Sequence, residues 1–256
     1  MLKLGLQMYT LRDLLEQDFK GTLAKVAELG YQGVEFHHFY GYSAEEVKSL
    51  LDELGLEVVG THVQYDSLVN DFDNVVAYHK AIGNRNIVVP YLSEEQRSDW
   101  NAIFTNLKEI GNKLKQQDMV LLYHNHDFEL TEKINGKTAL DTMYDTLPET
   151  ELLAELDTCW IHYAGYNPAE YIAAYAGRLP IVHWKDVKRK EDGSPLTVEL
   201  GQGEVNVAAV GDAADKAGVE WIVVEQDICT NPPLQSIETS LNWVKEYVKN
   251  GGKVNV

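Results

Sequence analysis

The segment MVLLYHNHDFEL (residues 119–130) decides how the rest of the chain is interpreted. Its first four residues are apolar without alternation, which is typical of a parallel strand buried on both faces. His124 and His126 follow two residues apart, so on an extended chain both side chains point to the same face. A buried parallel strand that ends in metal-ligand side chains is characteristic of the active face of a β/α barrel.

Strand-like and helix-like segments alternate along the whole chain. The predicted strands are residues 2–9, 33–37, 56–62, 86–90, the start of 119–130, 152–156, 180–185 and 221–225. The predicted helices are residues 19–29, 43–54, 72–82, 94–117, 139–147, 168–176, 205–217 and 237–248. Ser43 and Glu46 have the spacing of a capping box, and Pro168 suits the first turn of a helix.

These repeated strand–helix units, spaced roughly 30 residues apart, predict a single (β/α)₈ barrel domain over residues 1–256, since such barrels need about 250 residues. A doubly wound open sheet is the alternative. The phosphate-loop patterns that such a sheet can carry, G-x-G-x-x-G and G-x-x-x-x-G-K, are absent from the sequence.

Composition narrows the classes of partner. The formal net charge is −18, which repels phosphate backbones, so nucleic acid is not expected as a partner. No stretch approaches the roughly 18 apolar residues of a membrane span, and the N-terminal apolar run is too short for a signal peptide. Cys159 and Cys229 are expected to be reduced thiols. We therefore expect a cytoplasmic protein without membrane contact, and homo-oligomerisation stays open.

Polar residues stand at the predicted strand ends, where a barrel would bring them together. They are Glu35, His37, His62, His124, His126, Asp157, His183, Lys185 and Glu225. Carboxylates with imidazoles suit Mn²⁺, Co²⁺, Fe²⁺ or Zn²⁺ better than Ca²⁺, which prefers oxygen alone. Taken singly, Asp157 or Glu225 could equally be a helix cap or an ion-pair partner, so the prediction rests on their joint placement.

Several segments carry a resemblance to a known family: YHNHDFE (123–129), ELDTCW (155–160), YAGYNP (163–168), VHWKD (182–186), LGQGEVN (200–206) and VVEQD (223–227). They resemble the sugar phosphate isomerase/epimerase family, the xylose isomerase-like TIM barrels. Inosose dehydratases and ketose 3-epimerases belong to that family, and endonuclease IV is a more distant member. The resemblance covers nearly the whole chain but does not identify the substrate.

The resemblance implies one divalent metal ion held at the ends of strands five to eight. Asp157, His183 and Glu225 match the last three ligand positions, and His124 aligns with the first, with His126 as the competing choice. Ketose 3-epimerases have glutamate at that first position. A metal-bound histidine has its lone pair occupied, so His124 could not act as a second base, and one-sided chemistry is favoured.

The implied reaction is proton abstraction next to the carbonyl of a keto-sugar or inosose, leading to isomerisation or epimerisation, or alternatively to dehydration or elimination. Glu225 is the expected base and Lys185 the expected second catalytic group. Substrate binding is assigned to Glu35, His62, His126 and Trp184, the last as pocket wall. Manganese is the first choice of metal, and Co, Fe, Zn and Mg also fit. A nuclease and a non-catalytic sugar-binding barrel are the remaining alternatives.

Overall fold

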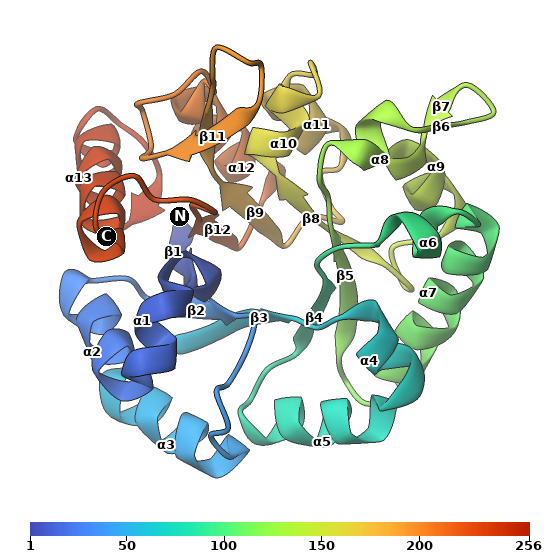
Figure 1. Cartoon of the computed structure of the whole chain (residues 1–256), viewed down its shortest axis with the longest axis horizontal. Coiled ribbons are helices and arrows are strands. Elements are labelled where there is room, and N and C mark those ends of the chain that lie inside the picture. Colours follow the sequence, from blue (N-terminus) through green and yellow to red (C-terminus); the bar gives the residue numbers. More distant parts are fainter.

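Eight parallel strands form a closed barrel in the computed structural model, which describes residues 1–256 (Figure 1). In barrel order they are β1 (Leu2–Gln7), β2 (Gly33–Phe36), β3 (Glu57–His62), β4 (Asn86–Val89), β5 (Val120–His124), β8 (Leu153–Asp157), β9 (Ile181–Trp184) and β12 (Trp221–Val224). The barrel closes because β12 pairs with β9 on one side and with β1 on the other. The predicted barrel is confirmed.

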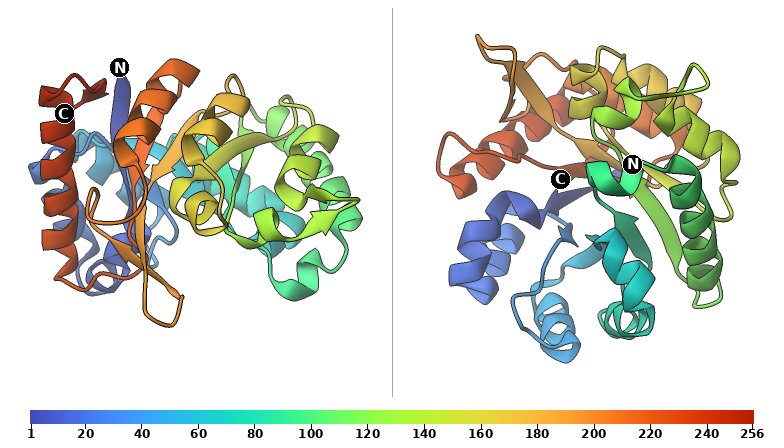
Figure 2. Two further views of the ribbon diagram at one scale, coloured as in Figure 1. Left: turned by 90° about the horizontal axis from the view of Figure 1, so that it is seen from above. Right: turned by 45° about the vertical axis from the view of Figure 1, so that its right-hand side comes forward.

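A ring of helices covers the outside of the barrel (Figures 1 and 2). The main helix after each strand is, in order, α2 (Phe19–Leu29), α3 (Ala44–Leu54), α5 (Phe72–Ala81), α7 (Trp100–Lys115), α9 (Ala139–Thr146), α11 (Pro168–Ala174), α12 (Val207–Ala217) and α13 (Pro233–Lys249). None of the helices is both long enough and apolar enough to cross a membrane.

Local sequence signals explain where several helices begin and end. Ser43 and Glu46 form the expected capping box at the start of α3, and Gly55 ends this helix in the left-handed conformation that glycine adopts without strain. Gly30 ends α2 in the same way.

The floor of the barrel is filled by apolar side chains that point inward. They are Val59, Val88, Leu122, Ile181, Trp221 and Val223, all buried. The Trp221 ring takes the space beside Gly33, where a Cβ atom would lie 2.7 Å from the indole. Because this floor is closed and apolar, the polar strand-end residues sit above it at the carboxyl ends of the strands, where active sites of such barrels are built.

The prediction of a single long helix over residues 94–117 is wrong, because this segment contains a break. It is divided into α6 (Glu94–Arg97) and α7, and Asp99 caps the second helix by accepting a hydrogen bond from the Ala102 backbone amide. Asp99 adopts non-helical backbone angles, because an aspartate in this position competes for the backbone donors of a helix.

Periodicity did not predict several extra elements. All but the last of them lie in loops that follow strands, and the last follows helix α13. They are η1 (Met8–Leu11), α1 (Arg12–Gln17), α4 (Tyr65–Asn70), α8 (Phe128–Thr131), α10 (Thr158–Tyr163), the hairpin β6 (Lys133–Ile134) with β7 (Lys137–Thr138), the hairpin β10 (Asp186–Arg189) with β11 (Pro195–Val198), and β13 (Val254–Asn255). The β10–β11 hairpin projects from the barrel (Figure 2). Near the C-terminus, β13 pairs with the start of β1.

Candidate functional site

The carboxyl ends of the strands surround a cavity of about 390 Å³. Its lining includes His62, His124, His126, Lys185 and Glu225, which come from the ends of four different strands or the residues just after them. The structure therefore brings together side chains that are far apart in the sequence, as the barrel prediction requires.

Four buried side chains present one ligand atom each within 4.8 Å of one another, namely His124, Asp157, His183 and Glu225. His124 Nε2 lies 3.6 Å from Asp157 Oδ2, and His183 Nδ1 lies 2.9 Å from Glu225 Oε2. These are the four metal ligands predicted from the sequence, and the cluster does not include His126. Two carboxylates and two imidazoles form the mixed oxygen–nitrogen donor set that divalent transition metals accept.

The two carboxylate oxygens of Asp157 have different surroundings. Oδ1 accepts hydrogen bonds from the backbone amides of Cys159 and Trp160 and so caps helix α10. Oδ2 is buried and accepts no hydrogen bond, and its nearest cation is the Lys185 ammonium at 3.2 Å. The Lys185 ion pair offsets part of the cost of burying this oxygen, and a cation among the four ligand atoms would give it the direct partner that it lacks. The residues present therefore fit a divalent metal.

Lys185 lies beside the same carboxylates. Its ammonium is 2.9 Å from Glu225 Oε2, 3.2 Å from Asp157 Oδ2 and 2.7 Å from Asp227 Oδ1. The side chain is buried, so these contacts supply the pairing that an internal charge needs. Lys185 therefore does not face the solvent. The structure also adds Asp227, which the sequence analysis missed although it stands two residues after Glu225.

A second buried layer lies next to the four-residue cluster and contains Glu155, Glu35 and His62. Glu155 Oε1 is 2.8 Å from His62 Nε2 and 3.0 Å from His124 Nδ1. Glu35 Oε2 accepts a hydrogen bond from Gln7 Nε2 at 3.1 Å and lies 2.6 Å from His183 Nε2. Sequence reasoning assigned no role to Glu155. Its position two residues before Asp157 on β8 was the available signal, because alternate residues of a strand share a face.

Burial and neighbouring charges shift the pKa values of these groups. Burial lowers the pKa of His124 to about 3, and the charge on His183 acts in the same direction, so His124 is a neutral imidazole with a lone pair to offer. Burial acts to raise the pKa of Glu225, but Lys185 and His183 together hold it well below its usual range. Glu225 is therefore an ionised carboxylate at neutral pH.

The other two predicted substrate-binding residues, His126 and Trp184, lie in different surroundings. His126 lines the cavity, its Nδ1 atom has no hydrogen-bond partner, and its ring stacks on Trp160 at a centroid distance of 5.5 Å. Trp184 lies on the other face of β9 from His183. Its indole donates a hydrogen bond to the Val207 carbonyl and packs on Trp243 and Tyr247 of α13.

Trp184 therefore does not line the cavity, contrary to its predicted place in the pocket wall. Adjacent residues of a strand point to opposite faces, so the residue after an inward-facing histidine faces the helices. Trp160, on α10, takes the place beside the cavity instead, with its ring 5.3 Å from the Lys185 ammonium.

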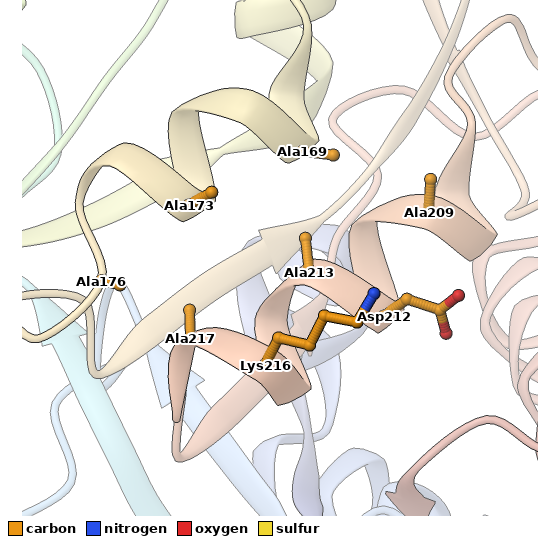
Figure 3. Close-up of a pocket in the computed structure, with 8 residues that line it drawn as sticks. All are labelled: Ala169, Ala173, Ala176, Ala209, Asp212, Ala213, Lys216 and Ala217. Atoms are coloured by element: carbon orange, nitrogen blue, oxygen red, sulfur yellow. The ribbon is translucent and has the colours of Figure 1, made fainter.

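A larger hollow lies outside the barrel, between α11 and α12 (Figure 3). Alanine side chains from both helices line it, and Asp212 and Lys216 are its charged residues. It has a volume of about 480 Å³, yet it holds no cluster of metal-ligand side chains. The cavity at the strand ends is therefore the better candidate for chemistry.

Comparison with known proteins identifies the family of this chain. The family model described as "Xylose isomerase-like TIM barrel" matches residues 23–247. The chain belongs to this family. An inosose dehydratase from Clostridium beijerinckii is 22% identical, and the alignment covers 90% of each protein.

Solved structures show the same fold at low sequence identity. A sugar phosphate isomerase/epimerase from Parabacteroides distasonis has a TM-score of 0.79 at 22% identity, covering 95% of this chain and 93% of that one. The IOLI protein, solved with a bound zinc atom, has a TM-score of 0.76 at 14% identity and covers 97% of this chain and 99% of that one.

Proposed function

We propose that this protein is a metal-dependent isomerase/epimerase-like enzyme that removes a proton from the carbon next to the carbonyl of a keto-sugar or inosose. The observation that carries the proposal is the Glu225 carboxylate, which lines the cavity beside Lys185 and within the four-residue ligand cluster. The names of the related inosose dehydratases and isomerase/epimerases support this choice of substrate class.

His124, Asp157, His183 and Glu225 would hold one divalent ion, through the two imidazole nitrogens and the two carboxylate oxygens that face one another. The chemistry that such an ion supplies is Lewis-acid polarisation of the substrate carbonyl and stabilisation of the enediolate charge. Manganese remains our first choice, although the donor set suits cobalt, iron and zinc as well and magnesium stays open.

Glu225 is the proposed base. It stays ionised because Lys185 and His183 offset the cost of its burial, and an ionised carboxylate is what proton abstraction requires. Burial acts against the charge on Lys185, but Asp157, Asp227 and Glu225 hold its pKa well above the ordinary value. So high a pKa makes Lys185 a poor proton donor. We therefore assign it the role of a fixed positive charge that stabilises developing negative charge on the substrate.

Dehydration is the second candidate outcome, and a specific observation favours it over epimerisation. Epimerisation needs an acid–base group on each side of the reacting carbon. The carboxylates that line the cavity are Glu225 and Asp227, and Asp227 pairs with Lys185. On the other side of the ligand cluster stands His124, which is hydrogen-bonded to Glu155. This position therefore provides no second carboxylate to the cavity. One-sided proton removal followed by loss of a hydroxyl suits this arrangement, as does aldose–ketose isomerisation.

The test is incubation with a panel of free and phosphorylated ketoses and an inosose in D₂O, with added Mn²⁺ or Co²⁺. Mass spectrometry distinguishes the outcomes. Isomerisation or epimerisation raises the mass of the sugar by the deuterium that it incorporates, whereas dehydration lowers the mass by one water. Glu225→Gln should abolish both signals. If the wild-type protein exchanged no proton and formed no product with any of these ketones, the proposal would fail.

The same experiment addresses the other classes of function. A non-catalytic sugar-binding barrel would bind a ketone without proton exchange. A nuclease would nick abasic DNA in a metal-dependent manner, which we do not expect of a chain with a net charge of −18.

A further inference from the structure

Glu155 is the common neighbour of three histidines inside the barrel. Its Oε1 atom lies 2.8 Å from His62 Nε2, 3.0 Å from His124 Nδ1 and 3.2 Å from His183 Nε2. The side chain is completely buried and does not line the cavity, so it cannot touch a substrate there. Its contacts are instead with imidazoles, two of which belong to the proposed ligand set.

We propose that Glu155 is a positioning residue that fixes which nitrogen His124 presents to a metal ion. Glu155 Oε1 lies at hydrogen-bond distance from one nitrogen of the His124 ring, and an imidazole nitrogen that donates to a carboxylate oxygen is the one that carries the proton. For His124 this nitrogen is Nδ1, and the lone pair is then on Nε2. Nε2 is the atom that faces Asp157 Oδ2 across 3.6 Å. The inference rests on the metal binding in the proposed function and adds a residue outside the four ligands.

Glu35 gives the same arrangement on the other side of the cluster. Its Oε2 atom lies 2.6 Å from His183 Nε2, which leaves Nδ1 of the same ring facing Glu225. His183 Nδ1 also faces a carboxylate, that of Glu225, so it would have to release its proton on binding a metal ion. The buried carboxylates behind the two histidine ligands still contact opposite ring nitrogens, Nδ1 of His124 and Nε2 of His183. This difference follows from where the two buried carboxylates stand, since each imidazole turns its other nitrogen toward the ligand cluster.

His62 completes the support, because it shares Glu155 Oε1 with His124 and stacks on the His183 ring at a centroid distance of 5.5 Å. Its ring is thus held between the two histidine ligands. A carboxylate behind a histidine ligand both orients the ring and raises its basicity, and loss of such a partner typically weakens metal binding by about 10–100-fold.

The first test is metal affinity, measured by titrating metal-free protein with Co²⁺ and following the visible spectrum of the bound ion. Glu155→Gln keeps the shape of the side chain but removes its charge, and we expect the dissociation constant to rise by about 10–100-fold. Glu199→Gln is the matched control, because Glu199 is also buried but contacts Asn231 and Ser236 away from the cluster. It should bind Co²⁺ as the wild type does. Circular dichroism verifies that both variants fold.

The second test needs no variant of Glu155. The ¹⁵N chemical shifts of the imidazoles in metal-free wild-type protein report which ring nitrogen carries the proton, and the His124 signals can be assigned by their loss in His124→Gln. We expect the proton of His124 on Nδ1. A proton on Nε2 would overturn the proposal, even if Glu155→Gln did not fold.

The outcomes separate this inference from the proposed function. If the wild-type protein bound no Co²⁺, metal binding itself would be wrong and the inference would fall with it. If the wild type bound Co²⁺ and Glu155→Gln bound it within twofold of the same affinity, the role of Glu155 alone would be refuted.

Discussion

The Lys185 ammonium lies 2.9 Å from Glu225 Oε2, the same oxygen that lies 2.9 Å from His183 Nδ1. The proposed base is thus held between a fixed positive charge and a histidine ligand. This placement offsets the cost of burying the Glu225 charge, and the proposed function relies on Lys185 and Glu225 together.

Metal content should depend on the ligand cluster. Asp157→Asn and His183→Ala each remove one donor from a buried four-residue set, so protein purified without chelator should contain about one metal ion per chain in the wild type and much less in either variant. Elemental analysis measures this. Asp73→Asn, an exposed position on α5, serves as the control. Equal metal content in all four proteins would refute the ligand assignment.

Glu225→Gln should reduce turnover to background at saturating metal, because the amide is nearly isosteric but cannot accept the proton. The measurement is kcat with the substrate identified in the D₂O assay, made at metal concentrations well above the affinity of the variant, since a ligand is also lost. If the variant retained wild-type kcat under these conditions, another residue would be the base.

Lys185→Met should lower kcat by about 10²–10³-fold, the range for loss of one group that stabilises developing negative charge. Lys185→Arg should not restore the rate, because the planar guanidinium cannot contact Asp157, Glu225 and Asp227 as the compact ammonium does. Steady-state kinetics test both variants. Full activity of the methionine variant would place Lys185 outside the machinery.

Two tryptophans should respond oppositely to replacement by alanine. Trp184→Ala should lower the free energy of unfolding by roughly 3–5 kcal/mol, because the buried indole packs between β9 and α13, yet leave kcat/KM of the folded enzyme unchanged. Trp160→Ala should lower kcat/KM with a smaller loss of stability, since its ring lies beside His126 and Lys185. Denaturant unfolding and kinetics on both variants provide the comparison.

Stability should fall as the pH rises because of Glu129. This side chain is completely buried, and burial raises its pKa from the usual 4.5 to about 8. The folded state therefore keeps a proton that the unfolded chain releases, so the stabilisation is full below about pH 4.5 and is lost as the pH rises to about 8. Urea unfolding at several pH values should show wild type losing stability relative to Glu129→Gln across that range. A constant difference would contradict the assignment.

The repeating pattern of the sequence determined the barrel. Buried apolar runs, capped helices and a spacing of about 30 residues are local features, and the (β/α)₈ barrel accommodates them all. The inward positions of His124, Asp157 and His183 also followed from the sequence, because residues at the carboxyl ends of parallel strands converge. The break at Asp99 was missed because residues 94–99 contain no apolar residue, so hydrophobic periodicity could not locate it, and the capping preference of one aspartate starts a new helix there.

Only the tertiary structure decided the partners of those residues. Glu35 and His183 are 148 residues apart yet lie 2.6 Å from each other, and His62 and Glu155 are 93 residues apart and in contact at 2.8 Å. Local pattern specifies which residues face inward, but barrel closure sets the heights and distances at which inward residues meet. The pairing of the buried carboxylates with particular ring nitrogens is therefore a property of the closed barrel.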